Sequence, residues 1–264
     1  MRALAIAVGA AVLLAFAAVV WVDSLFREPD ARKIESLTGA LGARTLLAVF
    51  AHPDDEISAA GALADAASNG VRVYVVTATR GEKGKADFSV SSSDELARIR
   101  EAELRAHTRA LGVTEQQVWH FPDSQVDRDI PALSQRIAAE IERIAPDAIL
   151  SFHPESGLTY HRDHRAVGEA TVRAIAATGS PARLVQLLVP AAMMRTFAGE
   201  RGALVAKNQP PATWAMPIDS RIKRRAWTIH ASQAGFIRRV YKVSPWVLYF
   251  FFDEEHYFVP EPRR

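Results

Sequence analysis

Residues 44–56 read RTLLAVFAHPDDE, an apolar run that ends abruptly in a histidine and a cluster of acids. The first eight of these positions are nearly all apolar, which is typical of a strand buried on both faces of a sheet. In parallel sheets the functional groups gather where the loops leave the carboxyl ends of the strands. The stretch therefore predicts a central buried strand with a polar site at its end.

The sequence downstream repeats the same alternation of short apolar runs and amphipathic stretches. Further strands are predicted at residues 71–79, 118–121, 147–152 and 183–189. Helices are predicted at residues 57–69, from a capping box at Ser92 and Glu95 to residue 111, at residues 131–145 and after His164. This alternation indicates an α/β domain over residues 44–264, with a Rossmann-like, mostly parallel sheet and helices on both faces.

The overall composition excludes several classes of protein. The chain has 264 residues, of which 49% are hydrophobic, so it can bury a sizeable core. Lys and Arg total 32 and Asp and Glu total 30, a net charge of +2, whereas a dedicated nucleic-acid-binding protein carries a larger basic excess. The absence of cysteine excludes disulfides, thiolate metal ligands and cysteine nucleophiles.

The N-terminal segment, residues 1–22, is predicted to be a single-pass transmembrane anchor. Residues 3–22 carry no charge, and a helix of that length spans about 30 Å, the hydrocarbon thickness of a bilayer. The alternative is a signal segment cleaved near residues 22–25, although such segments typically have a shorter apolar part and a more basic start. Basic residues counted alone place the C-terminal domain on the cytoplasmic side by a small margin, so the sequence does not assign the side of the membrane. Residues 23–43 are expected to be a polar linker.

Two clusters of metal-ligating residue types follow strands of the predicted sheet. His52 and Asp55 are three residues apart on a tight turn and can reach one ion, with Asp54 between them facing its open side. His161 and His164 follow the fourth strand. Two imidazoles and one carboxylate are a common catalytic zinc set. Each cluster alone also suits a structural role, as first-turn acids or ordinary loop histidines. Their occurrence at two strand ends of one sheet favours a metal site.

The chain also carries a series of short motifs. These are A-H-P-D-D at 51–55, T-R-G-E-K-G at 79–84, R-E-A-E at 100–103, L-G at 111–112, F-P-D at 121–123, H-R-D-H at 161–164 and H-A-S-Q at 230–233. Over residues 44–233 they resemble the PIG-L/LmbE family of zinc-dependent N-deacetylases, which act on N-acetylglucosaminyl-phosphatidylinositol and related conjugates. Members commonly have Gly and Pro where this chain has Tyr160 and Arg162, a change that keeps every expected ligand but alters the rim of the pocket.

The resemblance implies one zinc ion per chain on three ligands: His52, Asp55 and His164. Another divalent metal would suit the same ligands. Asp54 would act as general base and then as general acid in amide hydrolysis. We expect protonated His161 to stabilise the tetrahedral oxyanion together with the metal. Asp163 would orient His161, raise its pKa and hold its positive charge.

Four residues are candidates for binding a sugar substrate: Arg100, Asp123, Glu82 and His230. Arg100 and Asp123 match positions that the family uses for substrate, and both side chains suit hydrogen bonding to adjacent hydroxyls. Structural alternatives exist for the others and for Arg100 itself. Arg100 would pair with a nearby Glu on an exposed helix face, Glu82 would form a loop salt bridge with Arg80, and His230 would pack within a helix.

The C-terminal part, residues 221–252, admits two interpretations. A basic stretch at 221–242 is followed by PWVLYFFF at 245–252. Eight apolar residues are typical of a buried closing strand, which is the interpretation we favour. The alternative is a membrane-facing patch, with basic residues near anionic headgroups and aromatic residues at the interface.

The sequence thus predicts a membrane-anchored, zinc-dependent hydrolase that removes the N-acetyl group of a small or lipid-linked N-acetylglucosamine conjugate. One alternative is hydrolysis of a different acyl amide. Another is a membrane-tethered glycan-binding module without turnover, although binding alone gives no reason for an acid such as Asp54 beside the metal. No nucleic-acid partner is expected, and the sequence assigns no oligomeric state.

Overall fold

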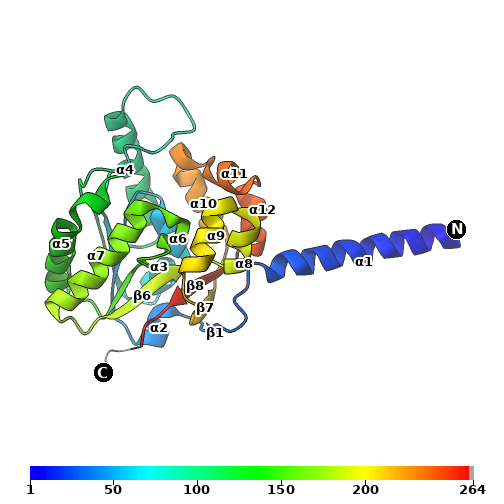
Figure 1. The fold of residues 1–264 in the computed structure, drawn as a ribbon, viewed down its shortest axis with the longest axis horizontal. Helices are drawn as coiled ribbons and strands as arrows, with labels where there is room; N and C mark the ends of the chain where they lie inside the picture. Colours follow the sequence, from blue (N-terminus) through cyan, green and yellow to red (C-terminus); the bar gives the residue numbers. More distant parts are fainter. Residues whose placement is uncertain (262–264) are drawn as a thin grey trace.

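An eight-stranded sheet forms the centre of the computed structural model, which describes residues 1–261 apart from the Ala3 side chain (Figure 1). The strand order is β1-β7-β8-β6-β5-β2-β3-β4. The strands are β1 (Arg32–Lys33), β2 (Thr45–Phe50), β3 (Arg72–Thr77), β4 (Glu115–Val118), β5 (Ala148–Phe152), β6 (Arg183–Leu188), β7 (Trp214–Pro217) and β8 (Glu254–Phe258). β8 runs antiparallel to its neighbours β6 and β7, and the other paired strands are parallel. The expected mixed α/β fold with a mostly parallel sheet is confirmed.

Strand β2 comes first in the chain among the parallel strands β2 to β6 and lies in the middle of that part of the sheet. The chain passes outward from β2 through β3 to β4 and then returns to the other side of β2 as β5. All residues of β2 and β5 are buried, as the continuous apolar runs predict for strands covered on both faces. The winding reverses between β2 and β5, and a reversal of this kind opens a crevice at the carboxyl ends of the two strands. Both predicted ligand clusters follow these two strands.

Helices cover both faces of the sheet, because right-handed crossovers send the helices after β2 and β3 to one face and those leading to β5 and β6 to the other. The first group contains α3 (Ala60–Ser68) and α4 (Ser93–Ala110), with α10 (Arg221–Ile229) packed against both and α2 (Leu37–Leu41), which precedes β2, packed against α3. The second contains α5 (Ile130–Ile144) and α7 (Arg162–Thr178), which pack against each other. The predicted capping box begins α4, since Ser92 Oγ accepts the Glu95 N–H at 3.1 Å.

The remaining short elements precede or follow the strand ends. They are α6 (Gly157–Tyr160), α8 (Ala191–Phe197), α9 (Gly199–Asn208), α11 (Phe236–Tyr241), α12 (Pro245–Phe251) and the 3-10 turns η1 (Asp55–Ala59), η2 (Val126–Asp129) and η3 (Ala231–Gln233). Figure 1 shows α8, α9, α11 and α12 grouped on the side of the body from which the N-terminal helix projects. After α12 the chain re-enters the sheet as β8, between β6 and β7.

Two predicted strands differ in the structure. The prediction of a closing strand at 245–252 is wrong: the segment forms α12, because Pro245 suits a first helical turn and Ser244 Oγ accepts the Val247 N–H at 3.3 Å. The strand that closes the sheet is β8, which follows α12. The strand predicted at 118–121 is displaced toward the N-terminus: β4 begins at Glu115 and ends at Val118, which pairs with Thr77 of β3.

The segment expected to be a polar linker, residues 23–43, contributes to the folded body. It contains β1, which pairs with β7, and α2. Phe26, Ile34 and Leu37 are buried in the main hydrophobic core. The charged residues of this segment suggested solvent exposure, but the apolar side chains between them anchor it to the sheet.

The N-terminal helix α1 (Arg2–Ser24) projects away from the body (Figure 1). Its part Leu4–Ser24 has a mean hydropathy of 2.6, and none of it is buried in the structure. Its length and composition suit a membrane span, and a signal segment meets the same criteria.

Candidate metal centre and catalytic pocket

The turn after β2 is held in place by its own acidic side chains. Asp55 Oδ2 accepts the backbone N–H groups of Ala51 at 3.1 Å and His52 at 2.7 Å. Asp54 adopts a left-handed backbone with a φ of 104°, and its N–H donates to Glu56 Oε2 at 2.9 Å. Left-handed backbone is uncommon for residues with side chains and is found where the surroundings enforce it, often at functional sites. The result is that Asp54 and Asp55 both line one cavity.

The second turn, between β5 and α7, also contains left-handed residues. Leu158 has a φ of 61° and Tyr160 a φ of 58°. Tyr160 stands where the PIG-L/LmbE family commonly has glycine, the residue for which this conformation costs least. The guanidinium of Arg165 lies 4.9 Å from the centre of the Tyr160 ring, a cation–π contact that helps to stabilise the turn.

His164 is oriented by this turn and by β5. Its ring stacks on Phe152 with a centroid distance of 4.3 Å and an interplanar angle of 5°. Its Nδ1 lies 2.9 Å from the carbonyl oxygen of Gly157. Because a carbonyl only accepts, we assign the proton to Nδ1, which leaves the Nε2 lone pair directed at the β2 turn.

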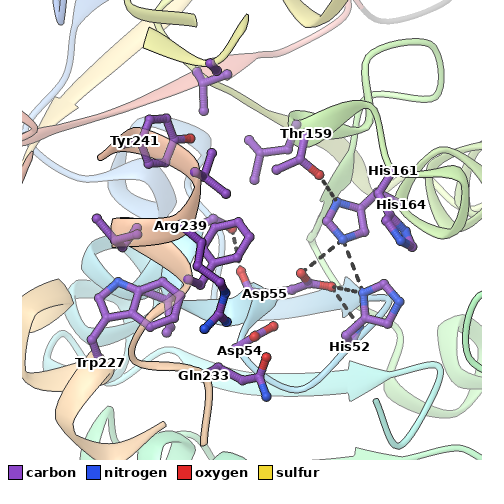
Figure 2. Close-up of a pocket in the computed structure, with 18 of the residues that line it drawn as sticks. His52, Asp54, Asp55, Thr159, His161, His164, Trp227, Gln233, Arg239 and Tyr241 are labelled. Carbon is purple, nitrogen blue, oxygen red and sulfur yellow. Dashed lines mark hydrogen bonds and ion pairs between the residues drawn. The ribbon is translucent and has the colours of Figure 1, made fainter. Parts of the chain in front are cut away.

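Donor atoms of three residues from the two turns converge, as Figure 2 shows. His164 Nε2 lies 3.3 Å from His52 Nδ1 and 3.1 Å from Asp55 Oδ1. His52 Nδ1 lies 3.4 Å from Asp55 Oδ2. Tetrahedral zinc ligands at about 2.0–2.1 Å from an ion lie about 3.3 Å from one another, so this donor set has the spacing that one ion requires. The three predicted ligand residues are therefore brought together.

A second grouping of imidazoles lies at the same place. Ligand atoms of His52, His161 and His164 all lie within 4.8 Å of one another. The ring centroids of His52 and His161 are 4.9 Å apart. Carboxylate oxygens of Asp55 lie 3.4 Å or less from the ligand nitrogens of both His52 and His164, whereas His161 Nδ1 already accepts the Asp163 N–H, which favours the carboxylate as the third donor.

The outward nitrogen of His52 is held by two buried carboxylates. Its Nε2 lies 3.2 Å from Asp163 Oδ2 and 3.3 Å from Asp123 Oδ1. Although burial opposes it, the carboxylates of Asp55, Asp123 and Asp163 raise the pKa of His52 well above its usual value. A carboxylate behind a ligating histidine fixes the proton on the far nitrogen and makes the near nitrogen a stronger ligand.

The expected pairing of Asp163 with His161 is wrong. Asp163 points inward from the first turn of α7, where its carboxylate accepts the N–H groups of Ser124 at 2.6 Å and Val126 at 3.2 Å, in addition to contacting His52. His161 is instead the N-cap of α7, and its Nδ1 accepts the Asp163 N–H at 3.3 Å. Burial, followed by the charges of His52 and His164, lowers the pKa of His161 to about 4. A neutral His161 that accepts at Nδ1 carries its proton on Nε2.

Asp54 lies beside the donor cluster and is paired with Arg100. Asp54 Oδ2 and Arg100 Nη2 are 3.0 Å apart. Burial raises the pKa of Asp54 to about 6, with Arg100 opposing the rise and Asp55 reinforcing it. A carboxyl group with a pKa near neutrality can both accept and return a proton under physiological conditions.

The four predicted sugar-binding residues separate into two pairs. Arg100 and Asp123 line the cavity, whereas Glu82 and His230 are not among its lining residues. The buried guanidinium of Arg100 donates to the carbonyl oxygens of Gly81 and Pro53, so it holds two turns together rather than facing solvent. Glu82 Oε1 accepts the Asp123 N–H at 2.9 Å and supports that loop from behind.

His230 belongs to a buried cluster that the sequence analysis did not identify. Its Nε2 lies 2.6 Å from Glu56 Oε1, which also lies 2.6 Å from His107 Nδ1. Burial opposes the effect, but the two histidines lower the pKa of Glu56 below its usual value. Glu56 directly follows the A-H-P-D-D motif and His230 begins the H-A-S-Q motif. Both motifs are visible in the sequence, but nothing in the sequence indicates that these two side chains are in contact.

The cavity has a volume of about 510 Å³ and combines two kinds of wall. The donor cluster, Asp54 and His161 occupy one side, and Trp227, Arg239 and Tyr241 face them across the opening in Figure 2. The side away from the donor cluster is largely apolar, with contributions from α8, α10, α11, α12 and the residue after α12: Met194, Trp227, Phe236, Ile237, Tyr249 and Phe252. Such a cavity suits a ligand with a polar end and a larger apolar portion.

Comparison with known proteins identifies the family. A sequence model of the PIG-L family, described as GlcNAc-PI de-N-acetylase, matches residues 47–175. The chain is 30% identical over 238 residues to the 1D-myo-inositol 2-acetamido-2-deoxy-alpha-D-glucopyranoside deacetylase of Nakamurella multipartita, covering 73% of this chain and 80% of that protein. The chain belongs to the PIG-L family.

Other relatives match over a smaller part of their length. The PIG-L chain is 33% identical over 136 residues to a Bacillus cereus protein named "Probable N-acetyl-alpha-D-glucosaminyl L-malate deacetylase 2", covering 50% of this chain and 61% of the relative. Several relatives are matched over only about half to three fifths of their own length. The structure resembles that of N,N'-diacetylchitobiose deacetylase from Pyrococcus horikoshii, with a TM-score of 0.62 and 18% identity over 86% of this chain and 87% of that one. At that identity the likeness concerns the fold.

Proposed function

We propose that this PIG-L protein hydrolyses the N-acetyl group of an N-acetylglucosamine-containing conjugate, with a divalent metal ion, zinc in the first instance. The observation that carries the proposal is the position of Asp54. A carboxyl group with a pKa raised to about 6 stands beside three donor atoms with metal-site spacing, on the wall of a cavity. Binding a glycan needs no such acid, whereas hydrolysis of an amide needs a group that moves a proton.

His52, Asp55 and His164 would hold the ion. A divalent ion bound there supplies a Lewis acid that polarises the amide carbonyl and lowers the pKa of water. The carboxylates of Asp123 and Asp163 hold His52 from behind, and β5 and the Gly157 carbonyl hold His164. Each imidazole therefore presents its ligand nitrogen without having to reorient.

Asp54 would remove a proton from the attacking water and then deliver it to the nitrogen of the departing amine. Its ion pair with Arg100 keeps the carboxylate in one orientation. Arg100 in turn is fixed by the backbone carbonyls of Gly81 and Pro53. We assign Arg100 to positioning Asp54, in place of the sugar-binding role expected from the sequence.

His161 would act as a neutral hydrogen-bond donor. Its Nδ1 is occupied by the Asp163 N–H, so its Nε2–H is available at the cavity wall for the oxygen that becomes negative during attack. This replaces the expected imidazolium, since the pKa of His161 is lowered to about 4.

The polar rim of the cavity would bind the sugar and its apolar side the aglycone. Asp123, predicted for this role, lines the cavity together with Gln233 and Arg239. The apolar residues of α11 and α12 support a conjugate with an apolar portion, including a lipid-linked one. Helix α1 would hold the protein at the membrane that contains such a substrate.

The test uses the purified full chain in detergent, with zinc and a panel of N-acetylglucosamine conjugates that includes the inositol, malate, chitobiose and phosphatidylinositol types. Released acetate and free amine are measured. We expect Asp54→Asn to reduce turnover by at least about 100-fold while zinc remains bound, whereas the exposed Asp219→Asn control retains activity. Chelation should abolish turnover, and added zinc should restore it.

The two alternatives predict other results. A glycan-binding module would bind a conjugate in the presence of metal but release no acetate, and Asp54→Asn would leave that binding unchanged. A hydrolase of another acyl amide would be inactive on the N-acetyl panel and active on the same sugars with longer acyl groups. Absence of any metal binding by the full chain would contradict the proposal at its first step.

A further inference from the structure

Exposed apolar side chains are concentrated on one part of the body. After the end of α1, the large apolar side chains exposed among the residues up to 261 are Phe88, Phe197, Leu204, Trp246, Val247 and Phe250. All but Phe88 belong to α8, α9 and α12. Figure 1 shows these helices on the side from which α1 projects. The distribution is therefore not the scattered one expected of an ordinary soluble surface.

Aromatic contacts connect this surface to the base of α1. Phe26, which follows α1, stacks on Phe197 with a centroid distance of 6.3 Å and on Phe251 with one of 5.8 Å. Phe251 meets Phe250 edge-on at 5.0 Å, and Phe250 stacks on Trp246 at 6.2 Å. A continuous series of rings thus leads from Phe26, just after the end of α1, to the exposed face of α12.

Helix α12 has apolar residues on both of its faces. Leu248 and Tyr249 are buried and line the cavity. Trp246 and Phe250 on the opposite face are 64% and 59% exposed, and the helix sequence PWVLYFF contains no charged residue. Amphipathic helices of soluble proteins present polar residues to water, so the outer face of α12 requires an apolar or interfacial covering.

The geometry points to a lipid bilayer as that covering: we propose that α12 docks into the headgroup layer of the same membrane that α1 spans. The charge-free part of α1 ends just before Asp23, which places Phe26 and the rings attached to it at the level of the headgroups. Trp and Phe side chains are favourable at that depth. The exposed basic residues Arg238 and Lys242, which precede α12, complement anionic headgroups.

Docking of α12 would bring the cavity close to the membrane. Its inner residues Leu248 and Tyr249 form part of the apolar wall, so one short helix would separate the cavity from the lipid headgroups. The inference depends on α1 as a membrane span and does not depend on the proposed hydrolysis.

Site-directed fluorescence in membranes tests this proposal. The chain contains no cysteine, so a single introduced cysteine can carry an environment-sensitive label such as NBD. The full chain is reconstituted into vesicles of phosphatidylcholine and phosphatidylglycerol with the label at Trp246→Cys or Phe250→Cys. Phe88→Cys, an exposed apolar residue that belongs to none of α8, α9 and α12, is the matched control, and Val12→Cys within α1 reports on the span.

We expect labels at 246 and 250 to be quenched by nitroxide-bearing lipids several-fold more than the label at 88, and to be shielded from aqueous iodide. Because both native side chains are exposed, neither substitution should unfold the protein, which a thermal melt verifies. Three results would overturn the proposal. Labels at 246 and 250 that behave like the one at 88 indicate a water-exposed α12. Shielding from iodide without quenching by lipid indicates a protein partner. Absence of lipid quenching at position 12 removes the span on which docking depends.

Discussion

His52 Nδ1 and His164 Nε2 lie 3.3 Å apart, although 112 residues separate them in the chain. They meet because β2 and β5 are neighbours in the sheet and both turns leave from the same edge. Since the winding of the sheet reverses between these strands, no helix fills the space above their ends. The centre is therefore a consequence of topology as much as of the residues themselves.

Removal of one of these imidazoles should abolish metal binding. We expect His164→Ala to lower zinc affinity by more than about 100-fold, because the remaining two donors do not complete a site. Metal content after dialysis and titration calorimetry measure the effect. The exposed His120→Ala is the control, and equal metal content in both variants would argue against the assigned ligands.

Asp163 should affect the metal through His52. Asp163→Asn replaces the carboxylate that contacts His52 Nε2 and accepts two backbone N–H groups. Loss of such an outer carboxylate typically lowers metal affinity by about 10–100-fold. Competition with a chromogenic chelator gives the affinity. An unchanged affinity would contradict this role of Asp163.

Glu56 should contribute more to stability than to chemistry. Its buried carboxylate contacts His107 and His230 at 2.6 Å and accepts the Asp54 N–H. We expect Glu56→Gln to reduce the free energy of unfolding by about 3 kcal/mol, because two buried imidazoles lose their charged partner. Urea unfolding of the full chain in detergent measures it, with the exposed Glu142→Gln as control. A loss no larger than that of the control would contradict a structural role for this cluster.

Acid should weaken the contact between the N-terminal segment and β8. His256, whose Nε2 lies 3.5 Å from the Glu254 carboxylate, and then Lys33, which donates to it at 2.6 Å, lower the pKa of Glu254 to about 2. A carboxyl group with a depressed pKa stabilises the fold above its unfolded pKa of about 4.5, and the contribution disappears as the pH falls through about 2.

Glu254→Gln should therefore lower stability at pH 7 by an amount on the order of 1 kcal/mol, because solvent screens the partly exposed pair. The difference from the unsubstituted protein should shrink between about pH 4.5 and pH 2. Melting temperatures across this range test the sign. A difference that grows on acidification would mean that the charge of Glu254 is unfavourable.

Much of the fold follows from local patterns in the sequence. The continuous apolar runs of β2, β3, β5 and β6 and the capping box of α4 are local features, so they predict their elements directly. The segment at 245–252 shows the limit of this reasoning. An apolar run of that length is compatible with a strand or a helix. Here Pro245 in the first turn and the Ser244 N-cap favour the helix.

The sequence by itself determined the family resemblance, the parallel sheet and the identity of the residues at the two turns. These follow from short motifs and strand patterns, which depend only on residues that are neighbours in the chain. Only the tertiary structure decided which atoms those residues face. Asp163 is two residues from His161 in the chain, yet its carboxylate lies against His52, and Arg100 holds Asp54 instead of projecting from an exposed helix face. The partners of a buried charge are fixed by which elements pack around it, and that packing joins residues far apart in sequence.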